Sequence, residues 1–228
     1  MPLVCFDPIN LYYFSMRLCL CKPITPSGPP TIAPFCYTGK MKNAIILHGK
    51  PEKEEYYSDE YPSASNSHWL PWLQKQLLMR DIIAHTPEVP RSYVPDYAVW
   101  CEEFERFDIT AETTLVGHSC GGGFIVRWLS EHSEVSVGKV VLVAPWIDPD
   151  RDETTDFFDF TIDPELAKRT KGITIFGSDD DFVSVQKSVQ ILRDTIKGIR
   201  HRQFHHYGHF CSEDLGTQEF PELLAEVV

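Results

Sequence analysis

The chain has 228 residues, of which 43% are hydrophobic and 24% charged, so it can bury a sizeable core and has an ordinary composition for one globular domain. Its formal net charge of −12 at pH 7 argues against binding to nucleic acid or to an anionic membrane as its main task. It contains no run of about 18 uninterrupted apolar residues, so no segment is predicted to span a bilayer. The seven cysteines lack regular spacing, which favours reduced thiols and a cytoplasmic location.

Residues 1–40 differ in composition from the rest of the chain. They hold seven of the 17 prolines, four of the seven cysteines and a single acidic residue, Asp7. The stretch 11–21 is apolar, but Arg17 interrupts it and no basic segment precedes it, which makes it a poor signal peptide. We therefore expect a poorly ordered N-terminal extension, with a targeting segment or a docking arm as the alternative. The functional domain is predicted to cover residues 41–228.

From Met41 onward, short apolar runs alternate with segments of helical periodicity. Six runs are predicted as strands: 44–47, 81–85, 114–117, 139–144, 173–177 and 201–205. Five segments are predicted as helices: 66–79, 97–107, 122–132, 184–196 and 220–228. This alternation predicts an α/β fold with a doubly wound, mostly parallel sheet of about six strands. Residues 146–170 break the alternation, since they are acidic, aromatic and proline-bearing, and we expect them to form a small lid over the strand ends.

The pentapeptide Gly117–Gly121 has the pattern G-x-S-x-G and lies between a predicted strand and a predicted helix. A sharp turn there holds its serine in a strained conformation with the hydroxyl above the sheet, which predicts Ser119 as a nucleophile. The first N–H of the helix, that of Cys120, would bind a developing oxyanion. Lys50, at the end of the first strand, is expected to supply the second N–H.

Two later strand ends carry a candidate acid and a candidate base. The turn Gly177–Asp181 ends in three aspartates, one of which would accept a hydrogen bond from an imidazole Nδ1–H. His209 lies in a Gly-His-aromatic turn after the last predicted strand, which suits a base delivered on a loop. The order Ser, Asp, His along the chain matches that of α/β-hydrolases.

Other interpretations of these residues are weaker. A metal cluster of the four C-terminal histidines is not expected, because adjacent histidines on a strand face opposite ways and no ligand completes the spacing; these are His201, His205, His206 and His209. The glycines after Cys120 do not form a phosphate loop, since no Lys-Ser/Thr follows them. His118 is expected to support the turn. We predict no metal and no cofactor.

From Met41, the chain resembles the small α/β-hydrolases of the retinoblastoma-binding protein 9/YdeN type. The segments that carry the resemblance are 44–49, 117–122, 140–146, 177–181 and 208–210. The resemblance implies a serine hydrolase that cleaves small esters, and some members of the family hydrolyse aminoacyl bonds. It implies Ser119 as nucleophile and His209 as general base. An ungapped match implies Asp181 as the acid, and the general G-x-x-D spacing implies Asp180; we favour Asp181.

The expected reaction is two-step acyl transfer on a small-molecule ester or amide, in a carboxylesterase-like enzyme or an aminoacyl or peptide hydrolase. An aromatic wall is predicted to bind a modest hydrophobic substrate; its substrate-binding residues are Trp69, Trp146 and Phe158, with Trp72, Phe157 and Phe160 nearby. The alternative is a catalytically silent α/β-hydrolase-fold module that binds a protein partner, which the sequence does not identify.

We predict that a chain beginning at Met41 folds and keeps the activity of the full chain, because the first strand-like run starts there. Circular dichroism and ester hydrolysis of the shortened and full chains would check this. Loss of folding on removal of residues 1–40 would contradict it.

Overall fold

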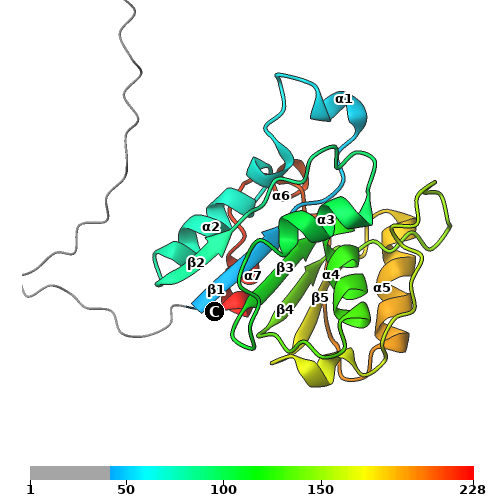
Figure 1. Ribbon diagram of the computed structural model, residues 1–228. Coiled ribbons are helices and arrows are strands. Elements are labelled where there is room, and N and C mark those ends of the chain that lie inside the picture. The colour runs from blue at the N-terminus through cyan, green and yellow to red at the C-terminus, as the bar shows by residue number, and fades with distance from the viewer. Residues whose placement is uncertain (1–41) are drawn as a thin grey trace, which may run out of the picture. The chain divides into compact units, whose positions relative to one another are not determined.

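The computed structural model describes residues 42–228, so the predicted extension over 1–40 lies outside the described residues. Six strands form one sheet in the order β2-β1-β3-β4-β5-β6, and every neighbouring pair is parallel (Figure 1). The strands are β1 Lys42–Leu47, β2 Ile82–His85, β3 Thr114–His118, β4 Val140–Val143, β5 Ile173–Ser178 and β6 Arg200–Phe204. The predicted α/β fold class is confirmed.

Helices cover both faces of the sheet (Figure 1). On one face lie α3 Tyr97–Phe104, α4 Cys120–Glu131 and α5 Val183–Thr195. On the other face lie α2 Leu70–Leu78 and α7 Pro221–Val227. Four shorter elements complete the described part: α1 Lys53–Tyr56, η1 Ala64–Asn66, η2 Leu166–Arg169 and α6 Ser212–Leu215. None of the helices within residues 42–228 has the length and apolarity needed to cross a bilayer.

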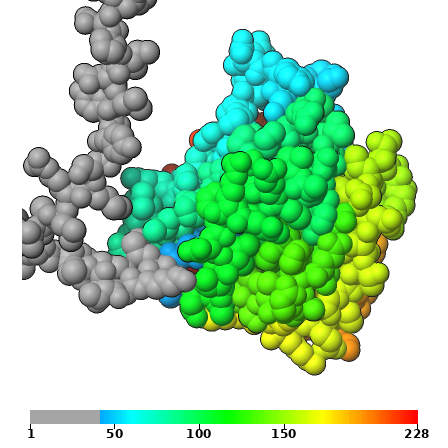
Figure 2. Space-filling view, in the orientation of Figure 1, coloured from blue at the N-terminus to red at the C-terminus, as the bar shows by residue number. Residues whose placement is uncertain are grey.

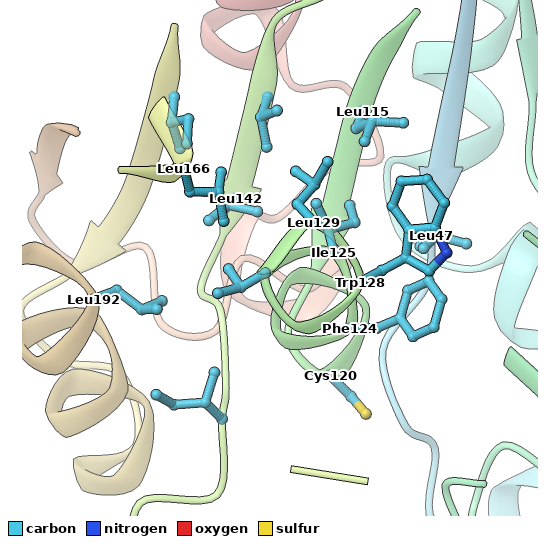
Figure 3. Packing of buried hydrophobic residues seen from close by; sticks show 14 of the residues in the cluster. Leu47, Leu115, Cys120, Phe124, Ile125, Trp128, Leu129, Leu142, Leu166 and Leu192 are labelled. Atoms are coloured by element: carbon cyan, nitrogen blue, oxygen red, sulfur yellow. The ribbon is translucent and has the colours of Figure 1, made fainter. Parts of the chain in front are cut away.

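The two-sided burial follows from the period of two along each strand. On β3, Leu115 packs into the core under α3, α4 and α5, and Val116 packs into the core under α2 and α7. Figure 3 shows Ile125 and Leu129 of α4 directed at the leucines of the strands. All four residues of β4 are buried, as expected for a parallel strand covered on both faces.

The helix predicted over 66–79 begins later than expected. Pro71 occupies the first turn of α2, where its missing N–H has no helical partner to lose. The 3₁₀ helix η1 ends at Asn66, Ser67 is extended, and His68 adopts a left-handed backbone with φ 56° before α2 begins. The short helices α1 and α6 were not predicted, because four residues are too few for a hydrophobic period to be visible.

Segment 146–170 covers less of the strand ends than a lid would. It starts at the end of β4, but Phe157 and Phe158 are buried in the core against Phe124 and its neighbours. Its last part is held at the far end of α4, where Arg169 donates hydrogen bonds to the carbonyls of three residues: Leu129, His132 and Val135. In Figure 1 the yellow-green segment passes α5 on its way to the short helix η2 at the opposite end of the sheet, and Figure 2 shows its atoms along the same edge of the domain. Only its beginning therefore lies at the carboxyl ends of the strands.

The strand order changes direction between β1 and β3, since β2 lies outside β1 and the later strands follow β3. In doubly wound sheets, ligands bind in the crevice at the carboxyl ends of such strands. The segments that leave β1 and β3 there begin with His48 and Ser119. The fold thus brings the predicted nucleophile and the predicted oxyanion loop to one place.

Gly123 and Gly122 of α4 give a matched test of this packing. A Cβ on Gly123 would lie 2.0 Å from the backbone oxygen of Trp146, whereas one on Gly122 would meet nothing closer than Pro145 Cβ at 3.0 Å. Both changes to alanine gain the same helix propensity, so their difference reports packing. We expect Gly123→Ala to lower the free energy of unfolding by about 1–3 kcal/mol and Gly122→Ala by clearly less, measured by urea denaturation. Equal stability of the two variants would contradict the packing described.

Candidate active site

Ser119 occupies a strained turn between β3 and α4. Its φ of 51° and ψ of −119° lie outside the regions that a serine ordinarily adopts, at a cost of about 1–3 kcal/mol. Backbone hydrogen bonds hold it there: its N–H donates to Val143, and its carbonyl accepts from Gly122, Gly123 and Trp146. The side chain of Ser119 is left partly exposed at the end of the sheet.

The glycines of the turn allow α4 to sit directly on the strand ends. A Cβ on Gly121 would lie 2.4 Å from the carbonyl oxygen of His48, and one on Gly117 would lie 2.7 Å from the Gly121 backbone. A Cβ on Gly49 would lie 3.1 Å from Ser119 Cβ. The segment after β1 therefore touches the predicted nucleophile.

His48 fixes the peptide that carries one predicted oxyanion donor. It is buried, and its Nε2 accepts a hydrogen bond from the Val89 N–H at 3.0 Å. Burial lowers the pKa of His48, so the ring is neutral and its proton lies on Nδ1, which donates to the Gly49 carbonyl at 2.7 Å. In a trans peptide the C=O and N–H point in opposite directions, so this bond sets the direction of the Lys50 N–H.

Both predicted oxyanion donors have their N–H groups available. Within residues 42–228, neither the N–H of Lys50 nor that of Cys120 donates to a protein acceptor. Cys120 is the first residue of α4, where helical N–H groups lack an intrahelical partner. Its own thiol is fully buried, and burial raises its pKa. Cys120 can therefore contribute its backbone and not a thiolate.

The three aspartates after β5 hold successive parts of the loop that carries His209. Asp179 accepts hydrogen bonds from His205 Nδ1 at 2.6 Å and from the His206 N–H at 3.1 Å. Asp180 accepts from the Gly208 N–H at 2.9 Å. Because β5 and β6 are paired up to Ser178 and Phe204, the turn and the loop leave the sheet side by side.

Asp181 is the member of this turn that bonds the predicted base. Its Oδ1 lies 2.8 Å from His209 Nδ1 and also accepts the Phe182 N–H at 2.6 Å. The Asp181 side chain is only 1% exposed, and that of His209 is 15% exposed. Asp180 instead accepts from Ser178 Oγ, and these hydrogen bonds hold the pKa of its carboxyl below the usual value. Of the two candidate acids, the structure brings Asp181 to His209 and places Asp180 under the loop.

His118 links the nucleophile turn to the base loop. Its Nε2 donates to the His209 carbonyl at 2.8 Å, and the two rings lie 4.9 Å apart. Burial holds the pKa of His118 well below its usual value, so it acts as a fixed neutral donor. In the described residues Ser119 Oγ and His209 Nε2 do not form a hydrogen bond, and such bonds often tighten only when substrate is bound.

The three predicted wall residues lie in different environments. Trp69 is fully buried, donates its indole N–H to the Phe210 carbonyl at 3.1 Å and packs edge-on against His118. It therefore supports the base loop from within the core. Trp146 is half-buried beside Ser119, and Phe158 packs edge-on against it at 5.2 Å and is itself buried. Of the three, only Trp146 is not fully buried, and its backbone N–H contacts Ser119.

A charged pair beside Trp146 was not predicted. The Lys50 ammonium forms an ion pair with Glu153 and lies 5.8 Å from the centre of the Trp146 ring. Asp148 accepts the Glu153 N–H at 3.0 Å and so fixes this end of segment 146–170. The acidic composition of the segment was the only signal for it in the sequence, and it gave no indication of the partner.

The chain is similar to known proteins in sequence and in fold. A family model described as "Serine hydrolase" matches residues 60–227. The chain is 29% identical over 179 residues to YdeN of Bacillus subtilis strain 168, described as a hydrolase, and the match covers 74% of this chain and 91% of YdeN. The crystal structure of the Bacillus subtilis ydeN gene product is similar with a TM-score of 0.68 and 25% identity, over 81% of this chain and 95% of that chain.

A more distant structure is similar in fold alone. Est1E from Butyrivibrio proteoclasticus, solved with ferulic acid bound, has a TM-score of 0.52 and 13% identity, over 82% of this chain and 90% of Est1E. The resemblance to YdeN predicted from the motifs is confirmed, and the link to retinoblastoma-binding protein 9 stays a prediction. On the family match and the YdeN relationship together, this chain belongs to the serine hydrolase family.

Proposed function

We propose that this serine hydrolase cleaves small ester or amide bonds through an acyl-enzyme on Ser119. The observation that carries the proposal is the hydrogen bond between the buried Asp181 carboxylate and His209 Nδ1, on a loop tied to the Ser119 turn through His118. A carboxylate at Nδ1 leaves the lone pair of Nε2 free to accept a proton. Nε2 is the atom that a general base at Ser119 must use.

In the proposed reaction, His209 Nε2 takes the hydroxyl proton as Ser119 Oγ attacks the acyl carbonyl. The negative charge that forms on the carbonyl oxygen is bound by the N–H groups of Cys120 and Lys50. The imidazolium of His209 then gives its proton to the leaving group. Water repeats the sequence on the acyl-enzyme and releases the acid.

The surroundings of Ser119 support a small acyl group. Trp146 offers an aromatic surface, and the Lys50–Glu153 ion pair lies next to it. A carboxylesterase-like specificity fits the aromatic surface, and an aminoacyl or peptide substrate could place its charged groups at the ion pair. The free thiols of Cys101, Cys120 and Cys211 support the proposed cytoplasmic location.

The proposal is tested by turnover of p-nitrophenyl esters and aminoacyl amides of graded length. We expect the wild type to hydrolyse short members of one series and Ser119→Ala to lose several orders of magnitude in kcat while staying folded. A wild-type protein inactive on every substrate, or an equally active Ser119→Ala, would favour the silent binding module.

Asp181→Asn and Asp180→Asn separate the two candidate acids. The first substitution keeps the shape of the side chain but favours the wrong tautomer of His209, so we expect kcat to fall by about 10⁴. Asp180→Asn keeps an oxygen that can accept the Gly208 N–H, so its loss of kcat should be small. Steady-state kinetics with both variants would check this, and the reverse order would contradict the assignment of Asp181.

His48→Gln tests the proposed oxyanion site. Outright removal of one oxyanion donor costs about 10²–10³ in kcat, and here the Lys50 N–H would be misdirected and not removed. We therefore expect kcat to fall by about tenfold to a hundredfold with little change in KM, because the lost interaction forms only in the transition state. His85→Gln, on β2, is the matched control and should behave as wild type. A change confined to KM would contradict the role proposed for His48.

A further inference from the structure

A group of metal-ligating side chains lies next to the base loop and outside the groups that react. One donor atom from each of His68, Cys211 and Glu213 lies within 4.8 Å of the others. His68 precedes α2, whereas Cys211 and Glu213 lie at α6, so the fold brings together residues more than 140 positions apart. The C-terminal histidines considered in the sequence take no part in this group.

We propose that His68, Cys211 and Glu213 bind a divalent transition metal such as Zn²⁺, with water as the fourth ligand. Imidazole nitrogen, thiolate sulfur and carboxylate oxygen are the donors that Zn²⁺ uses in proteins. Zn–ligand bonds of about 2.0–2.3 Å in a tetrahedron put donor atoms about 3.3–3.8 Å apart. His68 Nδ1 and the Glu213 carboxylate are already 3.7 Å apart, so a movement of about 1 Å by the thiol completes the site.

The orientation of His68 suits this role. Its Nδ1 accepts the Ser212 N–H at 3.2 Å, so the Nδ1 lone pair points at α6 and not into solvent. A metal would take the place of that weak hydrogen bond.

The charge around Cys211 favours a cation. Burial and the carboxylates of four residues raise the pKa of its thiol to about 12, so the thiol stays protonated until a metal ion displaces the proton; the four residues are Asp214, Glu213, Asp181 and Glu55. When the metal binds, the Cys211 S–H bond breaks, the sulfur keeps the electron pair and forms the S–Zn bond, and the proton passes to the buffer. The bound ion then neutralises part of this negative region.

Metal at this place should inhibit hydrolysis, and this part of the inference rests on the proposed function. Cys211 Sγ lies 4.0 Å from the His209 carbonyl oxygen, and the rings of His68 and His118 are 5.8 Å apart. Movement of Cys211 toward the ion would shift the His209 carbonyl, which His118 holds, and with it the position of the His209 ring. The step in which His209 takes the proton of Ser119 becomes slower as a result.

The binding test uses the full chain and Co²⁺, whose thiolate complexes absorb in the near ultraviolet. We expect the wild type to show a sulfur-to-cobalt band and Cys211→Ser to lose the part of it that belongs to this site. Zn²⁺ competition against a chromophoric chelator should show that Cys211→Ser and His68→Gln each weaken one site at least tenfold. Cys101→Ser and His85→Gln are matched controls and should bind as wild type, because neither residue belongs to a group of metal-ligating side chains in the described part of the chain. Identical cobalt spectra of the wild type and Cys211→Ser would overturn the site.

The activity test is separate. We expect micromolar Zn²⁺ to inhibit wild-type ester hydrolysis, EDTA to restore it, and Cys211→Ser to be at least tenfold less sensitive. Equal inhibition of wild type and Cys211→Ser would overturn the inhibitory role even if Co²⁺ binds. If the wild type hydrolyses no substrate at all, the proposed function fails, whereas the cobalt band still decides whether the metal site exists.

Discussion

The strained turn at Ser119 is the constraint on which the rest of the site depends. Such a backbone persists because four backbone hydrogen bonds hold Ser119 and because no side chain fills the space at its glycines. Gly121 allows α4 to touch the carbonyl of His48, and Gly123 allows it to touch that of Trp146. The turn therefore joins the ends of β1, β3 and β4 into one rigid corner, and the hydroxyl of Ser119 stands at the point where the strand order changes direction.

The base reaches this corner through a second network, which starts from the acidic turn after β5. Three consecutive carboxylates each accept a hydrogen bond from a different residue of the loop after β6. Only the last of them, Asp181, bonds the imidazole of His209. Neutral histidines complete the frame, because burial makes His48 and His118 donors of fixed direction. The site is therefore built from backbone groups and hydrogen bonds more than from ion pairs.

Periodicity and motif order were enough to predict much of this. The strands β1, β3, β4 and β5 have continuous apolar runs and the five long helices have hydrophobic periods, whereas Ser119 and His209 follow strands in motifs whose spacing is local. The choice between Asp180 and Asp181 was harder, because both follow β5 and only the path of a loop some 28 residues later decides which one meets His209. Contacts between loops, such as Lys50 with Glu153, leave no periodic signal in the sequence.

Aromatic composition alone did not predict how deeply each tryptophan is buried. Trp69 and Trp146 are alike as residues, but one is fully buried under the base loop and the other is half-buried beside Ser119. Trp69 lies inside the core under α2 and α7, whereas Trp146 packs at the edge of the cores on both faces. A wall inferred from residue type alone therefore combines core residues with residues that can meet a substrate.

The central claim is that Ser119 is an activated nucleophile. The most direct measurement is labelling of the full chain by a fluorophosphonate probe, followed by mass spectrometry of the modified peptide. If Ser119 is activated, we expect one probe per molecule, attached to Ser119, and no labelling of Ser119→Ala. A wild type that does not label, or a Ser119→Ala that labels equally, would contradict it.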